Sequence, residues 1–253
     1  MKKKKKNTIP WYEDYFGPDY LLIDYHKYTP KEVDFICDVL RCNKKIKLLD
    51  TACGYGRHLI PLVKRGIDVI GCDLSPFMLG EAEKKLKGAK KNRLVRCDLR
   101  YLPFLKVFDC ACNMFNSFGY FKSEEDNFKV LTSIAGALKL GGFFLLDLVN
   151  RDFIVRLLSK KDWFVNNGAI ILEKKWIDPI KNRSEIDVSV LDKKGKRDYH
   201  HSIRVYSFTE IRMLLEAAGF IVIDVFGGFS GEEFDVHHDR MLILSQVIDM
   251  EDL

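Results

Sequence analysis

One stretch constrains the fold more than any other: residues 46–58, Ile-Lys-Leu-Leu-Asp-Thr-Ala-Cys-Gly-Tyr-Gly-Arg-His. Its short apolar run, Ile46–Leu49, predicts a buried strand, and residues 57–63 are typical of the first turns of a helix. Between them, Gly54 and Gly56 allow a sharp turn and let a ligand approach the main chain without meeting a Cβ atom. The helix start also offers unpaired N–H groups. The stretch predicts a strand, a nucleotide-type binding loop and a helix; a tight turn that binds nothing is the alternative.

Apolar runs continue to alternate with helical patterns as far as about residue 150. Strands that alternate with helices pair in parallel through right-handed crossovers, so this order predicts an α/β fold with a parallel sheet. Helices are expected over 33–40, 76–87 and 123–139, the last one ended by Gly141 and Gly142, and strands over Ile67–Cys72, Asn92–Cys97, Val107–Cys112 and Phe143–Val149.

A different pattern occupies Trp163 to Tyr206, where turn residues separate three or four segments that alternate apolar and polar residues. Such alternation is typical of an antiparallel sheet with one exposed face. The expected strands there are Ala169–Ile177, Ser184–Leu191 and Tyr199–Tyr206, and the strand–helix pattern then returns with a helix over 209–218 and strands Phe220–Phe226 and Met241–Val247.

These patterns divide the chain into three parts. Residues 46–160 together with 207–253 are expected to form the core, and 161–206 an antiparallel insertion that covers the binding site. Residues 1–45 carry a basic tail and then an aromatic-rich segment from Ile9 to Tyr28, which is either a lid over a pocket or a pair of helices packed on the surface.

Charge and cysteine content restrict the function classes. The net charge is +5, but Lys2–Lys6 supply five of the 41 basic residues, so the rest of the chain is neutral, with 36 basic and 36 acidic residues. A nucleic-acid partner is therefore disfavoured, although the lysine run keeps it open. The seven cysteines form no Cys-x-x-Cys pair and predict free thiols in a reducing cytoplasm. No apolar run approaches a membrane span, and no apolar signal core follows the lysines.

Three acidic residues follow three successive predicted strands: Asp50, Asp73 and Asp98. Ligands bind beyond the carboxyl ends of strands in open α/β sheets, so these acids are expected to share one rim. Asp73 follows Gly54 by 19 residues, near the spacing at which an acid accepts hydrogen bonds from ribose hydroxyls. The rim therefore predicts a nucleoside pocket.

Absent residues narrow the nucleoside. A dinucleotide fingerprint places a third glycine where this chain has Leu59, and the Gly-Lys-Ser or Gly-Lys-Thr of a phosphate-binding loop is missing from the sequence. This loop therefore lacks the residues that bind a pyrophosphate group, which disfavours a dinucleotide or a nucleoside triphosphate as the ligand.

At this point the chain resembles the class I S-adenosylmethionine-dependent methyltransferases. The resemblance rests on Leu49-Asp50-Thr51-Ala52-Cys53-Gly54-Tyr55-Gly56-Arg57-His58, Gly71-Cys72-Asp73-Leu74-Ser75, Cys97-Asp98-Leu99 and Leu138-Lys139-Leu140-Gly141-Gly142. It implies a Rossmann-like, seven-stranded, mostly parallel sheet with an antiparallel last strand and helices on both faces. The insertion is similar to the antiparallel cover of the glycine N-methyltransferase-like branch.

The resemblance also implies a binding set for S-adenosylmethionine. The loop residues Ala52, Cys53, Gly54 and Gly56 would pass under its methionine part, with Asp50 near the amino group; Asp73 would hold the ribose; Leu74 and Met78 would flank adenine; Asp98 and Leu99 would recognise its amino edge; and Asn113 and Phe115 would lie beside the reactive methyl.

Methyl transfer needs alignment more than covalent help, because the sulfonium is already activated. His58 is the best-placed candidate for a base, and a helix-start histidine bonded to the backbone is the equal alternative. Asn113, Tyr120, Arg204 and Tyr206 are further candidates for the catalytic and acceptor side, although surface or core roles compete for Tyr120, Arg204 and Tyr206.

The residues at the end of the fourth predicted strand restrict the class of methyl acceptor. Its motif, Asn113-Met114-Phe115-Asn116, differs from the Asn-Pro-Pro-Tyr type of enzymes that methylate nucleobase amino groups, and no Pro-Cys pair exists. We therefore expect methylation of an N or O atom of a small molecule by a cytoplasmic monomer or homodimer that binds no metal and no membrane. An RNA or protein methyltransferase and a non-catalytic cofactor-binding protein are the alternatives. Adjacent His237 and His238 point different ways on a strand, which disfavours a metal site there.

Overall fold

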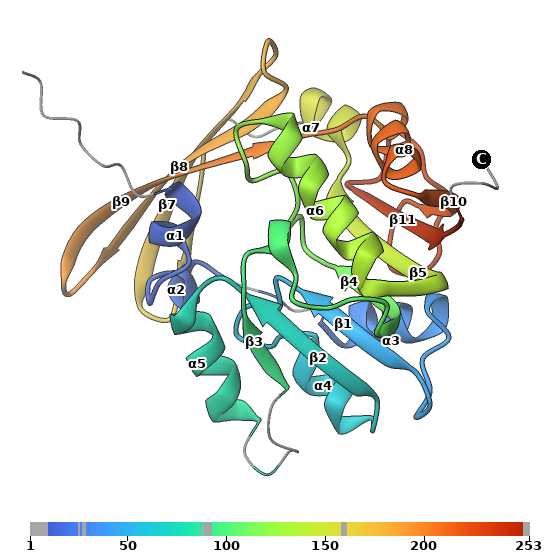
Figure 1. Cartoon of the computed structure of the whole chain (residues 1–253). Helices are drawn as coiled ribbons and strands as arrows, with labels where there is room; N and C mark the ends of the chain where they lie inside the picture. Colours follow the sequence, from blue (N-terminus) through green and yellow to red (C-terminus); the bar gives the residue numbers. More distant parts are fainter. Residues whose placement is uncertain are drawn as a thin grey trace, which may run out of the picture.

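A seven-stranded sheet in the order β10-β11-β5-β4-β1-β2-β3 organises the protein (Figure 1). β1 lies between parallel neighbours β2 and β4, while β11 runs antiparallel to both β5 and β10. The predicted mostly parallel sheet with an antiparallel last strand is confirmed. The strands are β1 (Lys47–Thr51), β2 (Asp68–Asp73), β3 (Leu94–Arg96), β4 (Phe108–Asn113), β5 (Leu138–Val149), β10 (Phe220–Phe226) and β11 (Arg240–Val247).

The computed structural model describes residues 10–24, 26, 29–86, 88, 93–157 and 161–249. The Lys2–Lys6 run lies outside these residues, as do Tyr25 and Tyr28 of the aromatic-rich segment. No helix in the described ranges combines the length and the apolar character that crossing a membrane requires.

Helices cover both faces of the sheet, which explains why the central strands read as continuous apolar runs. Leu48 is buried with the helices of one face and Leu49 with those of the other. The first face carries α3 (Thr29–Val39) and α4 (Leu59–Lys64), with α5 (Pro76–Lys85) following β2; the second carries the 3₁₀ helix η1 (Leu99–Tyr101), α6 (Glu124–Ala137) and α8 (Phe208–Ala217).

The junction between α6 and β5 differs from the expectation. α6 ends at Ala137, and Leu138 is already extended and paired with Phe108 of β4. Gly141 and Gly142 therefore lie inside β5, at a register shift, and do not end the helix. A Cβ atom on Gly142 would come within 2.8 Å of the Lys139 carbonyl oxygen, so the glycine is needed for close backbone approach.

A second, antiparallel sheet of four strands is inserted between β5 and α8 and follows α7 (Arg151–Leu157). Its first turn, Asn167-Gly168, has positive φ at both residues, as a two-residue hairpin with a type I′ turn requires. The last strand spans Gly195–Arg204, earlier than the expected Tyr199–Tyr206. The strands are β6 (Lys161–Asn166), β7 (Ala169–Asp178), β8 (Arg183–Asp192) and β9 (Gly195–Arg204).

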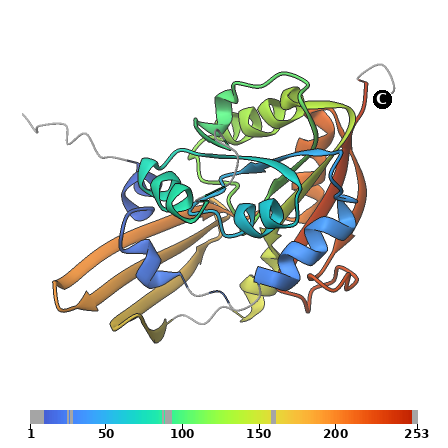
Figure 2. The same cartoon turned by 90° about the horizontal axis from the view of Figure 1, so that it is seen from below.

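The aromatic-rich N-terminal segment packs on this second sheet. It forms α1 (Trp11–Tyr15) and α2 (Tyr20–Ile23), and both Figure 1 and Figure 2 show these short helices lying against the four strands. Tyr15 and Ile23 are buried in a small apolar cluster with residues of β7 and β8 such as Ile171. The segment and the four-stranded sheet thus form one layer beside the carboxyl ends of the central strands.

Arg183 joins the four-stranded sheet to the loop that follows β4. Its guanidinium, at the start of β8, donates to the carbonyl oxygen of Phe121 at 3.0 Å and to Ser202 of β9 at 2.7–2.8 Å. The residue is only 8% exposed. Hydrogen bonds from a buried charged group are among the stronger ones, so this contact fixes where the second sheet lies.

We expect Arg183→Met to lower the free energy of unfolding by about 2–4 kcal/mol, because the carbonyls it serves lose a charged donor in a buried position. Urea unfolding followed by circular dichroism measures this change. Lys181→Met is the control, since the Lys181 side chain is 70% exposed and its ion pair with Asp178 lies at the surface, where such pairs contribute little to stability. Equal stability of the two variants would contradict the role given to Arg183.

Candidate functional site

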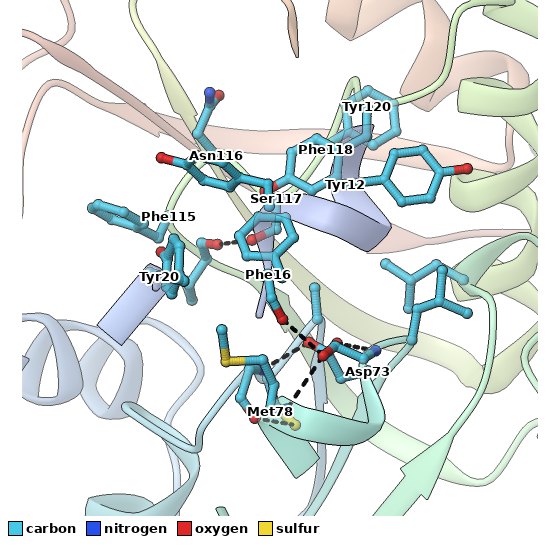
Figure 3. A pocket seen from close by; sticks show the side chains of 18 of the residues that line it. Tyr12, Phe16, Tyr20, Asp73, Met78, Phe115, Asn116, Ser117, Phe118 and Tyr120 are labelled. Atoms are coloured by element: carbon cyan, nitrogen blue, oxygen red, sulfur yellow. Dashed lines mark hydrogen bonds between the residues drawn. The ribbon is translucent and has the colours of Figure 1, made fainter. Parts of the chain in front are cut away.

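A cavity of about 660 Å³ opens at the carboxyl ends of β1, β2 and β4. The glycine loop after β1 forms its floor, the loop after β4 forms one side, and α1, α2 and β9 form the cover. Figure 3 shows Phe16, Tyr12 and Tyr120 facing the space above Asp73 and Met78. This is the position at which an open α/β sheet binds ligands, at the switch point between β1 and β4.

The glycine loop uses three residues in the left-handed region: Ala52 at φ 56°, Gly54 at φ 54° and Gly56 at φ 82°. Gly54 lines the cavity, and a Cβ atom there would meet nothing within 4 Å. Gly56 is not among the lining residues, and a Cβ atom there would come within 2.8 Å of Ile60 Cδ1. The first glycine therefore leaves room for a ligand, and the second allows α4 to pack.

Asp73 fixes this loop in place. Its Oδ2 accepts a hydrogen bond from the Gly54 amide at 2.8 Å, and its Oδ1 accepts one from the Ser75 amide at 2.8 Å. Burial raises the pKa of Asp73, and the amide donors act against that shift. The Ser75 hydroxyl caps α5 through the Met78 amide and donates to the carbonyl oxygen of Phe16 at 2.9 Å, so the cover is tied to the same corner.

Two buried polar atoms of opposite character are left without a partner among the described residues. They are Oδ2 of Asp50 and Nη2 of Arg57, and both residues line the cavity. Burial, and then the nearby charge of Asp73, raise the pKa of Asp50 to about 7. The other terminal nitrogen of Arg57, Nη1, is held by Glu32 and by the Thr29 hydroxyl.

His58 is bonded to a side chain, not to the backbone. Its Nε2 lies 2.6 Å from Oε2 of Glu32, a residue 5% exposed on α3. Burial lowers the pKa of His58, so the ring is neutral at pH 7, while hydrogen bonds from His58 and Arg57 hold the pKa of Glu32 below its usual range against the effect of burial. Glu32 was missed from the sequence; its signal was an acid in the first turn of an otherwise apolar helix face.

The loop after β4 is held in an uncommon conformation. Phe115 and Asn116 both have positive φ, 58° and 56°. Asp147 of β5 supports them: its Oδ2 accepts from the Phe115 amide at 2.7 Å, and its carbonyl oxygen accepts from the Asn116 amide. Arg240 of β11 pairs with Oδ1 of the same carboxylate. A strained loop fixed this firmly is typical of functional sites, and the sequence signal was an acid inside the apolar run of β5.

Aromatic rings and one histidine form the cover. Phe16 and Tyr120 stack with their centroids 5.8 Å apart. His201 of β9 lies between Trp11, at 4.6 Å, and Tyr15, at 5.2 Å. His201 lines the cavity, and burial lowers its pKa to about 3, so the ring stays neutral. Its Nδ1 has no partner in the described part of the chain. Sequence reasoning missed His201, because alternation in a strand does not say which of two adjacent histidines faces inward.

Some of the other residues predicted for the site line the cavity, such as Asp98, and some do not, such as Asn113. Asp98 caps η1 through the Arg100 amide and pairs with the Arg100 guanidinium, which lowers its pKa although burial opposes this. Asn113 is buried, donates to the Thr51 hydroxyl at 2.9 Å, and is not among the lining residues. The predicted residues that line the cavity are Asp50, Ala52, Cys53, Gly54, His58, Asp73, Leu74, Met78, Asp98, Leu99, Phe115 and Tyr120.

Arg204 and Tyr206 are not among the residues that line the cavity, and they take the competing structural role. β9 ends at Arg204, and the chain then turns toward α6 and α8. Arg204 therefore pairs with Glu124 and Glu210, and the Tyr206 hydroxyl donates to Glu124 at 2.8 Å. Both side chains fasten the end of the inserted sheet to the core.

The described residues contain no group of three potential metal ligands, the His237–Asp239 stretch included. His238 instead bonds to Asp235, three residues earlier.

Three comparisons relate this geometry to known proteins. The profile of the family described as "Methyltransferase domain" matches residues 48–142. The chain is 30% identical over 213 residues to a glycine/sarcosine N-methyltransferase of Aphanothece halophytica, covering 82% of this chain and 78% of the relative. It is 29% identical to a dTDP-3-amino-3,4,6-trideoxy-alpha-D-glucopyranose N,N-dimethyltransferase of Streptomyces venezuelae, covering 79% and 86%.

The fold has a close match among solved structures. An S-adenosylmethionine-dependent methyltransferase from Clostridium acetobutylicum superposes with a TM-score of 0.77 at 22% identity, covering 90% of this chain and 94% of that one. Such identity speaks for the fold alone, whereas the glycine/sarcosine relative shares enough of its length and sequence to define the family. The chain belongs to the class I S-adenosylmethionine-dependent methyltransferases, as its glycine loop predicted, and S-adenosylmethionine is its cofactor.

Proposed function

We propose that this methyltransferase methylates the nitrogen of a small-molecule amine. The observation that carries the proposal is the division of one cavity into two unlike parts. One end presents a carboxylate oxygen and a guanidinium nitrogen that have no partner among the described residues, and the cover presents aromatic rings and a neutral histidine. The first part suits an amino-acid group, and the second suits an uncharged amine on an organic body.

The amino-acid end fits the methionine part of the cofactor. Asp50 Oδ2 would accept from its ammonium group, and Arg57 Nη2 would donate to its carboxylate. Burying an unpaired polar atom costs free energy, so a zwitterion that satisfies both atoms at once is strongly favoured. Glu32 and Thr29 hold Arg57 in position for this task, and His58 supports Glu32.

The nucleoside end fits ribose and adenine. Each Asp73 oxygen already accepts one amide hydrogen bond, and a carboxylate oxygen has a second lone pair, so both can still accept ribose hydroxyls. Leu74 and Met78 supply apolar surface for the adenine ring, and Asp98, held by Arg100, supplies an acceptor at its edge.

The cofactor supplies a methyl group already activated by a positively charged sulfur. The chain's own contribution is therefore alignment and exclusion of water. Asp147 holds Phe115 and Asn116 rigidly at the side of the cavity, and the rings of Phe16 and Tyr120 cover it. The four-stranded sheet, which carries His201, acts as the cover of the acceptor side.

Charge on the acceptor side favours nitrogen over a carboxylate or phosphate acceptor. Arg240, the arginine beside the loop after β4, is neutralised by Asp147. His201 carries no charge at neutral pH and offers a lone pair or an N–H group to a neutral amine. The relatives point the same way, since the two named above are N-methyltransferases of glycine or sarcosine and of an amino sugar. Burial lowers the pKa of both His58 and His201, so neither ring accepts the proton of the amine readily. The amine therefore enters in its neutral form, and the proton that it loses after methyl transfer goes to water.

Cofactor affinity is expected to depend on pH through Asp50. Its pKa is about 7 without ligand, and the ammonium of the cofactor requires the charged carboxylate. Below pH 7 binding must therefore release a proton, and affinity for S-adenosylhomocysteine should fall by up to about tenfold per pH unit, while above pH 7 it should level off. Calorimetry between pH 5.5 and 8.5 measures this.

Asp50→Asn is the matched control for that titration. It should bind more weakly at pH 8 and lose most of the slope below pH 7; any slope that remains reports on Asp73, whose pKa is also raised by burial. A wild-type affinity that does not change between pH 5.5 and 7 would contradict the assignment of Asp50.

His201→Phe separates acceptor recognition from cofactor binding. The phenyl ring keeps the contacts with Trp11 and Tyr15 and removes the ring nitrogens, so kcat/KM for the amine should fall about tenfold, the loss of about 1.4 kcal/mol that one hydrogen bond contributes, with the affinity for S-adenosylhomocysteine unchanged. His200→Phe is the control, because His200 points outward to Glu185 and Asp187. Parallel losses in both variants would argue against an acceptor role for His201.

A matched panel of acceptors tests the reaction class. Amino sugars, small amino acids such as glycine and sarcosine, and their hydroxyl analogues are incubated with S-adenosylmethionine, and S-adenosylhomocysteine is quantified. We expect product with amines and none with the hydroxyl analogues. Methylation of the hydroxyl compounds, or of RNA or protein alone with loss on deleting Lys2–Lys6, would overturn the proposal.

A further inference from the structure

Two cysteines meet at the end of α3, far from the cavity. The helix closes with a Schellman motif: the Cys42 amide donates to the Cys37 carbonyl at 2.8 Å, the Arg41 amide donates to the Asp38 carbonyl at 3.2 Å, and Arg41 has φ 50°. This motif commonly brings the side chains of its first and last residues into contact. Here those residues are Cys37 and Cys42, and the Cys42 sulfur donates to the carbonyl oxygen of Ile36, the residue before Cys37, at 3.8 Å.

A guanidinium completes the arrangement. Nη1 of Arg65, at the end of α4, lies 3.5 Å from the Cys37 sulfur, and Nη2 pairs with Asp34 one turn earlier on α3. The C-terminal end of a helix disfavours negative charge, so a thiolate at Cys37 depends on these donors. The Cys42 thiol first, and then Arg65, lower the pKa of Cys37 to about 6, whereas the pKa of Cys42 is raised.

The other five cysteines lack this combination. Cys53, Cys72, Cys110 and Cys112 are buried, and the pKa of each is raised. Cys97 is half-buried and Cys72 lowers its pKa, but no guanidinium acts on it, and the charged groups that do are the acids Asp73 and Asp98, which oppose a thiolate. Cys97 is therefore the natural internal comparison for Cys37.

We propose that Cys37 is a peroxide-reactive modification site and that Cys42 is its resolving thiol. The Cys37 thiolate attacks one oxygen of hydrogen peroxide; an S–O bond forms, the O–O bond breaks, and hydroxide leaves, so that Cys37 becomes a sulfenic acid. The Cys42 sulfur then attacks the Cys37 sulfur; an S–S bond forms, the S–O bond breaks, and the departing hydroxide takes the Cys42 proton and leaves as water. The two thiols lose two electrons in total, and the peroxide gains them.

Peptide mapping tests the site on the full-length, reduced protein. After brief treatment with equimolar hydrogen peroxide, free thiols are alkylated and the protein is digested with trypsin, which cuts between Arg41 and Cys42. We expect the peptide of residues 32–41 joined by a disulfide to that of residues 42–44, with Cys97 still alkylated. Oxidation of Cys97, or of a buried cysteine, as fast as Cys37 would overturn the proposal.

Three variants assign the roles. Cys42→Ser should leave a Cys37 sulfenic acid that dimedone traps, and a missing adduct at Cys37 would also overturn the proposal. Arg65→Gln should slow oxidation of Cys37 about tenfold, because the thiolate loses its cation. Arg93→Gln, which breaks an ion pair with Asp68 away from any thiol, should leave the rate unchanged. Thermal unfolding of each variant verifies that the fold is intact.

Discussion

The hydrogen bonds that Asp73 accepts from the amides of Gly54 and Ser75 hold the cavity together. They connect the glycine loop after β1 to the start of α5 after β2, and Ser75 in turn donates to the carbonyl of Phe16 in the cover. A buried carboxylate costs free energy that such amide donors offset. One side chain at the end of β2 thus sets the relative positions of the loop, the helix and the aromatic cover.

The charges that the fold leaves unpaired explain where a ligand binds best. Glu32 pairs with one side of Arg57 and accepts a hydrogen bond from His58, but it leaves one guanidinium nitrogen without a partner among the described residues. Asp50, near the end of β1, likewise has one oxygen without a partner among the described residues, and the nearby charge of Asp73 makes its own negative charge less favourable. The fold therefore carries a small electrostatic strain that a zwitterion relieves, which fits the methyl donor of this family.

Short sequence patterns predicted much of the fold. The predictions were wrong where a contact between residues distant in the sequence decided the structure. The strand ends and helix starts of the first half follow from short apolar runs, caps and glycines. The end of α6 does not, because Leu138 leaves the helix to pair with Phe108, thirty residues away in the sequence. In the sequence, Asp147 is an acid in an otherwise apolar strand. In the structure, its carboxylate, near the C-terminal end of β5, accepts a hydrogen bond from the Phe115 amide.

By itself, the sequence determined the parallel core, the glycine loop and the three acids at the strand ends, because each of these is written within a few adjacent residues. Only the tertiary structure decided which side chains face the acceptor. In β9, His201 points into the cavity and His200 away from it, and Arg204, the last residue of the strand, pairs with Glu124 of α6 and Glu210 of α8. Adjacent side chains on a strand lie on opposite faces, so the register of β9 makes this choice, and pairing with β8 sets that register.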